Sequence, residues 1–519
     1  MPYLRLLTNA LVAGALGAVM LLHLVLLLNP QAPLHPGVLF SLGWRLGLTA
    51  GLLLAAAFFF ASLVRYLSTR RGPGWLSLRL LAWMTTLVVG LGALLAWLNL
   101  SAYQASLTPG AARRGAVVAL TLAISAFVLL LIALVHYGFG RRGSRVGGAL
   151  LGIAVVAAMV LPLVARGPAE PGAGPARGVR PVDATLREPP AGRVWIILLD
   201  GASLDYVSPA AAQGRLPNFG RLLDGGAYLT LFSIEPRQPS PIWASVATGR
   251  YPPGTAIRAH DRYRGGWATL DLLPRYVFAD LLVLSGVLTA TPHRVEDLRG
   301  APLWRILDAS GFPAVTAAWP FAVQGASGRG RILPAEPGRS GLAPVDADRL
   351  ARERFEAALA EGGDVQVAAL RYAALSAGAR DALLPPSAPA GRRPVDAVYD
   401  FIDAELGRVL ERLAPDDLLL VVSGYRLESP SPLVRVRDRL VDDAGLAGEA
   451  NRSDGFMLAY GRQVSPGRKT LGAIVDVLPT VLYYLGLPVA RDMDGFARTD
   501  LFVGSLTGGR PVSFIRSYQ

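Results

Sequence analysis

The chain has 519 residues, of which 52% are hydrophobic and 17% charged, and it contains no cysteine. This composition is too apolar for an ordinary soluble protein, and the lack of cysteine excludes disulfides, thiolate zinc sites and cysteine nucleophiles. Most of the net charge of +13 arises in the first 165 residues, which hold 11 arginines and no acidic residue, whereas the remainder has 40 basic and 38 acidic residues. Because no basic run with interleaved aromatics occurs, we expect no nucleic-acid partner.

Five apolar segments in the first third of the sequence are long enough to cross a bilayer, which takes about 20 residues. They are Ala10–Leu28, Leu46–Val64, Leu80–Leu100, Gly115–Val135 and Val146–Ala165. Arginines follow the second and fourth segments, whereas Arg113 and Arg114 after the third run against this pattern. The positive-inside rule then predicts a multi-pass protein of the cytoplasmic membrane, with a cytoplasmic N-terminus and an extracytoplasmic C-terminal domain. Residues 1–165 form the predicted transmembrane region, and membrane lipids are its expected partners.

The next stretch, residues 166–193, contains six prolines and five glycines. Such a composition cannot bury a core and is typical of a semi-extended spacer. We therefore predict a linker at 166–193 and a domain boundary on either side of it.

After the linker, short apolar runs alternate with helical patterns. The predicted strands are Val194–Leu199, Val365–Leu370, Leu418–Val422 and Phe456–Tyr460, and the predicted helices include Leu216–Leu223, Leu303–Ala309, Val395–Leu413 and Ala473–Leu485. This alternation predicts an α/β domain over 194–519 with a mostly parallel sheet. We expect the chain to leave the third strand in a loop, Ser423–Arg426.

Several motifs follow one another in a recognisable order. Asp200-Gly201 ends the first strand, and SPIWASVATGRYPPGTAI (240–257), APLWRILDASGFPAVTAAWP (301–320) and DVLPTVLYYLGLPVARDMDG (476–495) come later. Together they resemble the type I phosphodiesterase/nucleotide pyrophosphatase branch of the alkaline phosphatase superfamily. The five spans before an external domain are also similar to the layout of phosphoethanolamine and lipoteichoic-acid transferases.

This resemblance implies an alkaline-phosphatase-like fold and two metal ions, usually zinc, held by Asp and His. A Ser or Thr at a helix N-terminus would attack phosphorus. Asp200 matches the first metal-binding aspartate, although an Asp before Gly is also a common turn residue. The nucleophile position falls on Pro239, and Ser240 fits only with a loop one residue shorter. A helix N-cap before Ile242–Ala247 is the alternative role for Ser240.

The remaining ligand positions of the family are occupied by other residues. The resemblance places Ser376 and Arg380 at one pair of ligand positions, Gly424 and Tyr425 at the next, and Asn451 at the last histidine. The globular part contains two histidines, His260 and His293, and we expect both in solvated loops away from Asp200. Two zinc ions cannot be held by this inventory, so Asp200 and Ser240 are interpreted as vestigial and no cofactor is expected.

The sequence therefore favours a membrane-anchored pseudoenzyme that binds or scaffolds at the cell envelope. Arg380 and Arg426 stand at or beside former ligand positions, and we expect them to bind a phosphate or another anionic headgroup, since arginine pairs well with phosphate. Another envelope protein is the other expected partner. The alternative is an active phosphodiesterase or phosphotransferase that acts on envelope lipids or nucleotides with Zn, Mn or Mg, using Asp200 and Ser240.

Overall fold

The structure is a computed structural model. It describes residues 2–69, 77–137, 145–170, 178–182, 188–235, 237–266, 268–277, 279–323, 328, 330–334, 343–376, 394–427 and 452–519. The chain divides into two compact units. The first, called the helical unit, comprises Met1–Gly174 and Asp261–His293, and the second, called the α/β unit, comprises Pro175–His260 and Arg294–Gln519.

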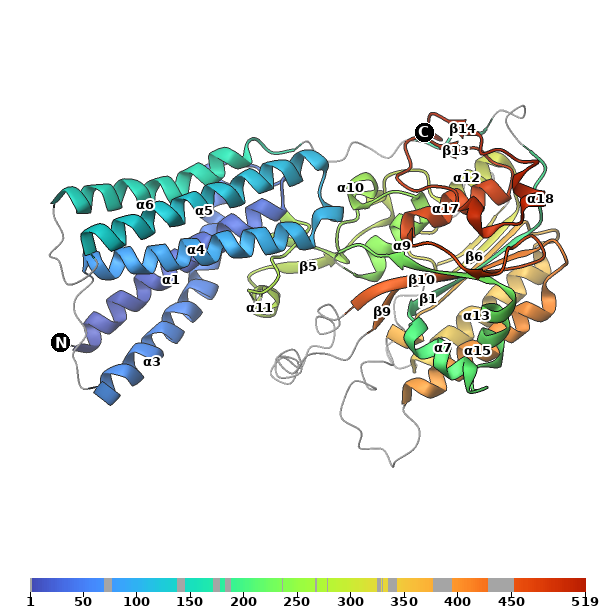
Figure 1. Cartoon of the computed structure of the whole chain (residues 1–519), viewed down its shortest axis with the longest axis horizontal. Coiled ribbons are helices and arrows are strands. Elements are labelled where there is room, and N and C mark those ends of the chain that lie inside the picture. Colours follow the sequence, from blue (N-terminus) through green and yellow to red (C-terminus); the bar gives the residue numbers. More distant parts are fainter. Residues whose placement is uncertain are drawn as a thin grey trace. The chain divides into compact units, whose positions relative to one another are not determined.

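The helical unit contains long apolar helices, shown in blue to teal in Figure 1. They are α1 (Pro2–Leu28), α2 (Pro36–Leu46), α3 (Leu52–Thr69), α4 (Leu78–Ala102), α5 (Pro109–Tyr137) and α6 (Arg145–Arg166), with a π-helical turn (Gly47–Gly51) between α2 and α3. Five helical stretches are long and apolar enough to cross a membrane among the described residues, and α2 to α3 count as one of them. The prediction of five candidate spans is thus confirmed.

Close packing of α1 against the α2–α3 stretch depends on small residues. A Cβ atom placed on Gly14 would lie 2.2 Å from the carbonyl oxygen of Gly51 and 2.9 Å from the Cβ of Ala55. A side chain at position 14 would therefore clash at this crossing. Small residues of this kind let apolar helices in a membrane approach each other closely.

The segment Asp261–His293 packs with the helices and is called the insertion. It forms an antiparallel sheet of β3 (Asp261–Gly265), β4 (Ala268–Leu270) and β5 (Thr289–Pro292) in the order β4-β3-β5, together with α11 (Asp280–Leu284). Its apolar side chains share a core with α1, α2 and the turn between them: Leu21, Val25, Leu26, Ala32, Val38, Leu42 and Leu46 meet Tyr263, Ala268, Leu270, Ala279, Leu282 and Leu288. The division of the chain therefore differs from the predicted boundaries, because this core draws 261–293 into the helical unit.

Two buried asparagines fix one loop of the insertion to the ends of α1 and α4. Asn29 Nδ2 donates to the carbonyl of Leu272 (2.8 Å), and its Oδ1 accepts from the amides of Asp271 (2.7 Å) and Leu272 (3.0 Å). Asn99 makes a similar pair with the N–H and C=O of Arg275. A carboxamide carries one acceptor and two donors, so it can satisfy a peptide unit that would otherwise be buried without a partner.

The α/β unit is built on a mixed sheet in the strand order β11-β2-β10-β9-β1-β8-β6-β7, with β12 also paired to β2. The strands are β1 (Val194–Gly201), β2 (Ala227–Phe232), β6 (Ala314–Ala317), β7 (Arg331–Leu333), β8 (Val367–Tyr372), β9 (Leu418–Leu427), β10 (Arg452–Tyr460), β11 (Gly467–Arg468) and β12 (Gly472–Ala473). Pairing is parallel except where β10 meets β2 and β9. The predicted α/β domain with a mostly parallel sheet is confirmed.

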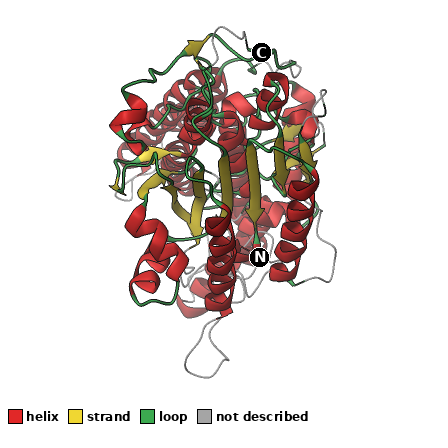
Figure 2. Cartoon of the chain, turned by 90° about the vertical axis from the view of Figure 1, so that its right-hand side faces the viewer, coloured by secondary structure: helices red, strands yellow, loops and turns green. Residues whose placement is uncertain are grey.

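Helices cover both faces of this sheet (Figure 2). One face buries a core that includes Trp195, Ile197 and Leu199 of β1. The helices on this side are α7 (Leu204–Ala212), α8 (Pro217–Gly225), α13 (Pro344–Glu361) and α15 (Pro394–Arg412). The opposite face packs against α9 (Pro239–Thr248) and α12 (Leu303–Ser310), and α17 (Val477–Tyr484) packs on α9. Because side chains alternate along β1, Asp200 faces the α9 side.

The described parts of the predicted linker make specific contacts. Glu170 accepts from Arg114 at 2.5 Å and from Thr108 at 2.9 Å, within the helical unit. Farther on, the amide of Arg180 donates to the carbonyl of Tyr518 within the α/β unit (2.8 Å). The boundary between the units falls after Gly174, inside the stretch predicted to be a spacer.

Candidate functional site

The candidate site lies where parallel strands of the α/β unit end. β1, β8 and β9 run in the same direction, so their carboxyl ends share one edge of the sheet, the position where α/β proteins gather ligand-binding residues. Asp200 stands at this edge, near the end of β1, and its side chain is fully buried. A buried carboxylate needs hydrogen bonds or an opposite charge to remain ionised.

Among the described residues, two side chains bind Asp200. The indole Nε1 of Trp243, on α9, donates to Oδ1 at 2.6 Å. Arg371, on β8, donates from Nε to Oδ1 at 3.0 Å and from Nη2 to Oδ2 at 2.5 Å. The register of the sheet explains this pairing, because Arg371 lies opposite Leu198 and thus faces the same side as Asp200. Both oxygens of the carboxylate therefore have partners from the protein.

Arg371 is held in its charged form by its surroundings. Burial of its guanidinium opposes the charge, but Asp200, Tyr425 and Asp348 together outweigh this effect and raise the pKa of Arg371. Its Nη1 also donates to the carbonyl of Ala318 at 3.3 Å. The side chain is 13% exposed, which makes Arg371–Asp200 a largely buried, bidentate ion pair.

A second buried carboxyl, Asp348 on α13, lies close to this pair. It accepts from the amides of Ala373 (3.0 Å) and Ala374 (2.8 Å), which follow the end of β8. Burial raises the pKa of Asp348 to about 6, although the two amides and Arg371 pull it down. Asp348 thus fixes the chain that follows β8. With a pKa of about 6, its carboxyl group binds a proton at a pH only slightly below neutral.

Ser240 occupies the second position of α9, and its hydroxyl lies 2.7 Å from Nδ1 of His260. Gln238 is the N-cap residue, so Ser240 does not have the capping role that the sequence suggested. Gln238 Oε1 accepts from the backbone amide of His260 and so fixes the imidazole near Ser240. His260 is exposed, as expected of a solvated residue, but it is bonded to a candidate site residue, which the sequence analysis did not foresee.

The start of α9 is poor in hydrogen-bond donors. Pro239 and Pro241 stand on either side of Ser240 in the first turn, and proline has no N–H. Anion binding at a helix N-terminus depends on these first amides. Of the first three residues of α9, Ser240 alone has an N–H with which to bind an anion.

β9 continues as a strand where a loop was predicted. Ser423–Arg426 remains in β9 and pairs with β10. On its other side β9 pairs with β1, where Leu199 lies opposite Ser423 and Gly201 opposite Arg426, so a register shift accommodates one extra residue of β9. Gly424 lies under α9, and a Cβ atom there would come within 2.2 Å of Cγ2 of Ile242. Close packing of α9 on β9 therefore requires a glycine at position 424.

Some of the residues singled out by the sequence cannot be placed. Arg380 and Asn451 lie outside the described residues, and for Arg426 the backbone is described but the side chain is not. Of the sequence-predicted site residues, the side chains of Asp200 and Ser240 are described. Trp243 lies on α9, as Ser240 does, and its bond to Asp200 joins α9 to the end of β1. His293 ends the insertion and belongs to the helical unit.

The donor set at Asp200 does not fit the two-metal centre that the resemblance implies. Across the described ranges, no three His, Asp or Glu side chains are grouped as a metal site requires. The guanidinium of Arg371 contacts both oxygens of Asp200 and places a positive charge where a metal cation would have to bind. No metal-dependent step can be derived from these residues.

Sequence reasoning missed Arg371, although a signal was present. Arg371 follows the apolar run Val367–Leu370, and strands of a parallel sheet are buried on both faces. An arginine in such a strand needs a buried acidic partner, and Asp200 is the acidic residue of the neighbouring strand β1.

Comparisons with known proteins find a matching family model and several similar solved structures. Residues 194–425 match the family model of type I phosphodiesterase / nucleotide pyrophosphatase. Similar solved structures include murine ectonucleotide pyrophosphatase/phosphodiesterase 5, inactive and in complex with AMP (TM-score 0.41, 13% identity, covering 60% of this chain and 100% of that chain). The human protein of the same name is similar too (TM-score 0.38, 14% identity, 60% and 99% covered). No curated protein matches the chain.

Proposed function

Residues 194–425 carry a type I phosphodiesterase/nucleotide pyrophosphatase domain, and we propose that in this chain the domain binds a ligand at the cell envelope without hydrolysing a phosphodiester. The observation that carries the proposal is the bidentate pair between Arg371 and Asp200. A guanidinium supplies the positive charge that the carboxylate needs for burial, but it offers no Lewis-acid site to activate a nucleophile. Arg371 thus stabilises the fold around Asp200 but supplies no group that could activate a nucleophile.

The first turn of α9 supports the same proposal. A phosphoryl group under attack needs donors that stabilise its developing charge. Pro239 and Pro241 remove two such donors from the helix N-terminus, and Gly424 and Tyr425 on β9 offer no carboxylate or imidazole.

The helical unit is proposed to anchor this domain to the outer face of the cytoplasmic membrane, with the N-terminus in the cytoplasm. Its five candidate spans support the anchor, and the arginine distribution supports the orientation. The proposed partners are membrane lipids, an anionic headgroup or another envelope protein. Arg380 and Arg426 are the residues proposed to meet an anion.

The test uses the full chain in lipid nanodiscs, because the insertion shares its core with the helices. Metal content is measured after dialysis against trace zinc, manganese and magnesium, and hydrolysis of bis(4-nitrophenyl) phosphate is followed with each metal. We expect substoichiometric metal and a rate no higher than that of Ser240→Ala. About two metal ions per chain, or metal-dependent hydrolysis abolished by Ser240→Ala, would overturn the proposal.

The contact between Ser240 and His260 favours a second candidate function, a metal-independent transfer reaction. In this reaction, Ser240 Oγ would attack an acyl or phosphoryl centre while His260 Nδ1 accepts the hydroxyl proton, and the leaving group would depart with its electron pair. Labelling with a fluorophosphonate probe tests this candidate. Labelling that is lost in both Ser240→Ala and His260→Gln would support it, whereas no labelling of the unchanged protein would rule it out.

A further inference from the structure

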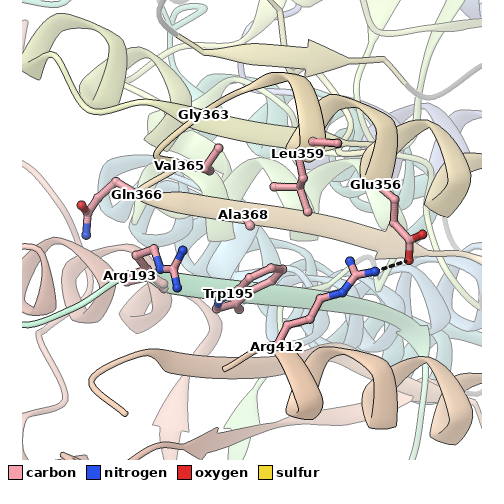
Figure 3. Close-up of a pocket in the computed structure, with 11 residues that line it drawn as sticks. Arg193, Trp195, Glu356, Leu359, Gly363, Val365, Gln366, Ala368 and Arg412 are labelled. Atoms are coloured by element: carbon pink, nitrogen blue, oxygen red, sulfur yellow. Dashed lines mark ion pairs between the residues drawn. The ribbon is translucent and has the colours of Figure 1, made fainter. Parts of the chain in front are cut away.

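A cavity of about 530 Å³ opens in the α/β unit at the amino ends of β1 and β8. It lies at the opposite edge of the sheet from Asp200, so it is separate from the candidate site. Its volume falls in the range of small-molecule pockets, about 300–1,000 Å³. Figure 3 shows the residues that line it.

The floor of the cavity is apolar. It is formed by Trp195 on β1, Leu359 on α13, and Val365 and Ala368 near and on β8. Trp195 directs its indole Nε1 away to Asp417, at 3.1 Å, which leaves the apolar part of the ring for the cavity. A flat or aliphatic group can bury apolar surface against such a floor.

Two arginines stand beside this floor, and each has donors for which the described part of the chain provides no partner. Arg193 binds Asp417 through Nε at 3.2 Å, and Arg412 binds Glu356 through Nη2 at 3.4 Å. Glu356 Oε1 also lies 3.6 Å from Nη1 of Arg352, so this carboxylate is shared between two guanidinium groups. Figure 3 shows the side chains of Arg193 and Arg412 on either side of Trp195.

We propose that this cavity binds a small monoanion with a carboxylate or phosphate group and a flat apolar body. Asp417, which lies outside the lining, pairs with Arg193, and Glu356 is shared between Arg412 and Arg352, so Arg412 is the lining guanidinium whose charge is only partly matched. Nη1 and Nη2 of Arg193, with Nη1 of Arg412, are placed to form charge-assisted hydrogen bonds with the anion. The apolar body lies on Trp195 and Leu359. This site is independent of the proposed function, because no residue of the Asp200 pair lines it.

The experiment titrates the full chain in nanodiscs with 2-naphthoate and, separately, with its neutral analogue 2-naphthamide, by calorimetry. Empty nanodiscs give the contribution of the lipid. We expect saturable binding of one naphthoate per chain, and binding of the amide about tenfold weaker because it lacks the charge-assisted bonds. Equal binding of acid and amide would contradict an anion site.

Variants of the lining arginines test whether naphthoate binds in this cavity. Arg193→Gln and Arg412→Gln should each weaken naphthoate binding about tenfold. Arg462→Gln is the matched control, since Arg462 forms an exposed ion pair with Asp416, next to the partner of Arg193. If Arg462→Gln weakens binding as much as the other two, or if naphthoate does not bind, the proposal is overturned. Binding that persists in Asp200→Asn would separate this site from the one at the other edge of the sheet.

Discussion

Asn29 in the helical unit and Asp200 in the α/β unit are both fully buried, yet one is neutral and binds peptide groups whereas the other is charged and binds a guanidinium. The amide of Asn29 matches the hydrogen-bonding pattern of a peptide unit, so the main chain alone can satisfy it. A buried carboxylate also needs a compensating charge. The site around Asp200 therefore requires a cation, and Arg371 supplies it from within the chain.

The comparison predicts the largest effect for the charged pair. Arg371→Ala leaves Asp200 buried without its cation, and we expect the free energy of unfolding to fall by about 3–5 kcal/mol. Thermal unfolding of the full chain, followed by tryptophan fluorescence, measures this loss.

The double variant Asp200→Asn/Arg371→Met serves as the control for that prediction. Removing both charges leaves no unpaired ion, so the double variant should unfold at a higher temperature than Arg371→Ala. If Arg371→Ala unfolds like the unchanged protein, the ion pair does not stabilise the site.

Asp348 combines features of Asp200 and Asn29, because it is a buried carboxyl group, like Asp200, that accepts hydrogen bonds from peptide amides, as Asn29 does. Its pKa is about 6 in the folded protein and 3.8 as the reference value, so the folded state binds the proton more tightly between these pH values. The free energy of unfolding should therefore fall by about 2–3 kcal/mol from this group as the pH rises from about 4 to above 6.

Asp348→Asn checks this pH dependence. Chemical unfolding at several pH values should show the extra slope in the unchanged protein and its absence in the variant. A slope that is the same in both proteins would assign the pH dependence to other groups.

Loss of the neutral hydrogen bonds of Asn29 should affect mainly the loop of the insertion that they hold. Asn29→Ala leaves the amides of Asp271 and Leu272 and the carbonyl of Leu272 without this partner, and an unsatisfied buried group costs about 1–3 kcal/mol. Hydrogen exchange should accelerate at Asp271 and Leu272, while β1 and β8 keep their protection. Thr121→Ala, at an exposed helical position, is a control that should leave the insertion unchanged.

The smallest effect is expected for an exposed ion pair. Arg331 and Glu361 form such a pair, with side chains 46% and 64% exposed. Arg331→Ala should change the free energy of unfolding by about 0.5 kcal/mol or less, and the change should shrink further in high salt. A loss as large as that of Arg371→Ala would mean that burial does not set the difference between the two pairs.

Periodicity and length sufficed to predict the helices of the first unit and the central strands of the second. Val194–Leu199 and Phe456–Tyr460 are buried runs that lie within β1 and β10, because burial on both faces leaves a continuous apolar signal. The strands of the insertion, Asp261–His293, are short, so its sequence carried no such signal. Its place in the helical unit depends on contacts of Asn29 and Asn99 with residues about 170–240 positions away, which local pattern cannot encode.

The candidate site was predictable in part. Asp200 could be placed at a strand end from the sequence, and the apolar run before Arg371 marked an arginine in a buried strand. That these two residues pair could not be predicted, because the pairing of β1 with β8 depends on the topology of the whole sheet. The bond between Ser240 and His260 spans 20 residues of irregular chain, and its geometry depends on Gln238 holding the amide of His260.

The contact between Asn29 and Leu272 joins residues 243 positions apart. A ribosome adding about 5–20 residues per second needs on the order of ten to fifty seconds to make the chain between them. During this interval the end of α1 must remain without the peptide groups that later satisfy Asn29. The helical unit thus finishes folding only after residues 175–260 of the α/β unit have been synthesised, and a factor that shields the end of α1 in that period would raise the yield of folded protein.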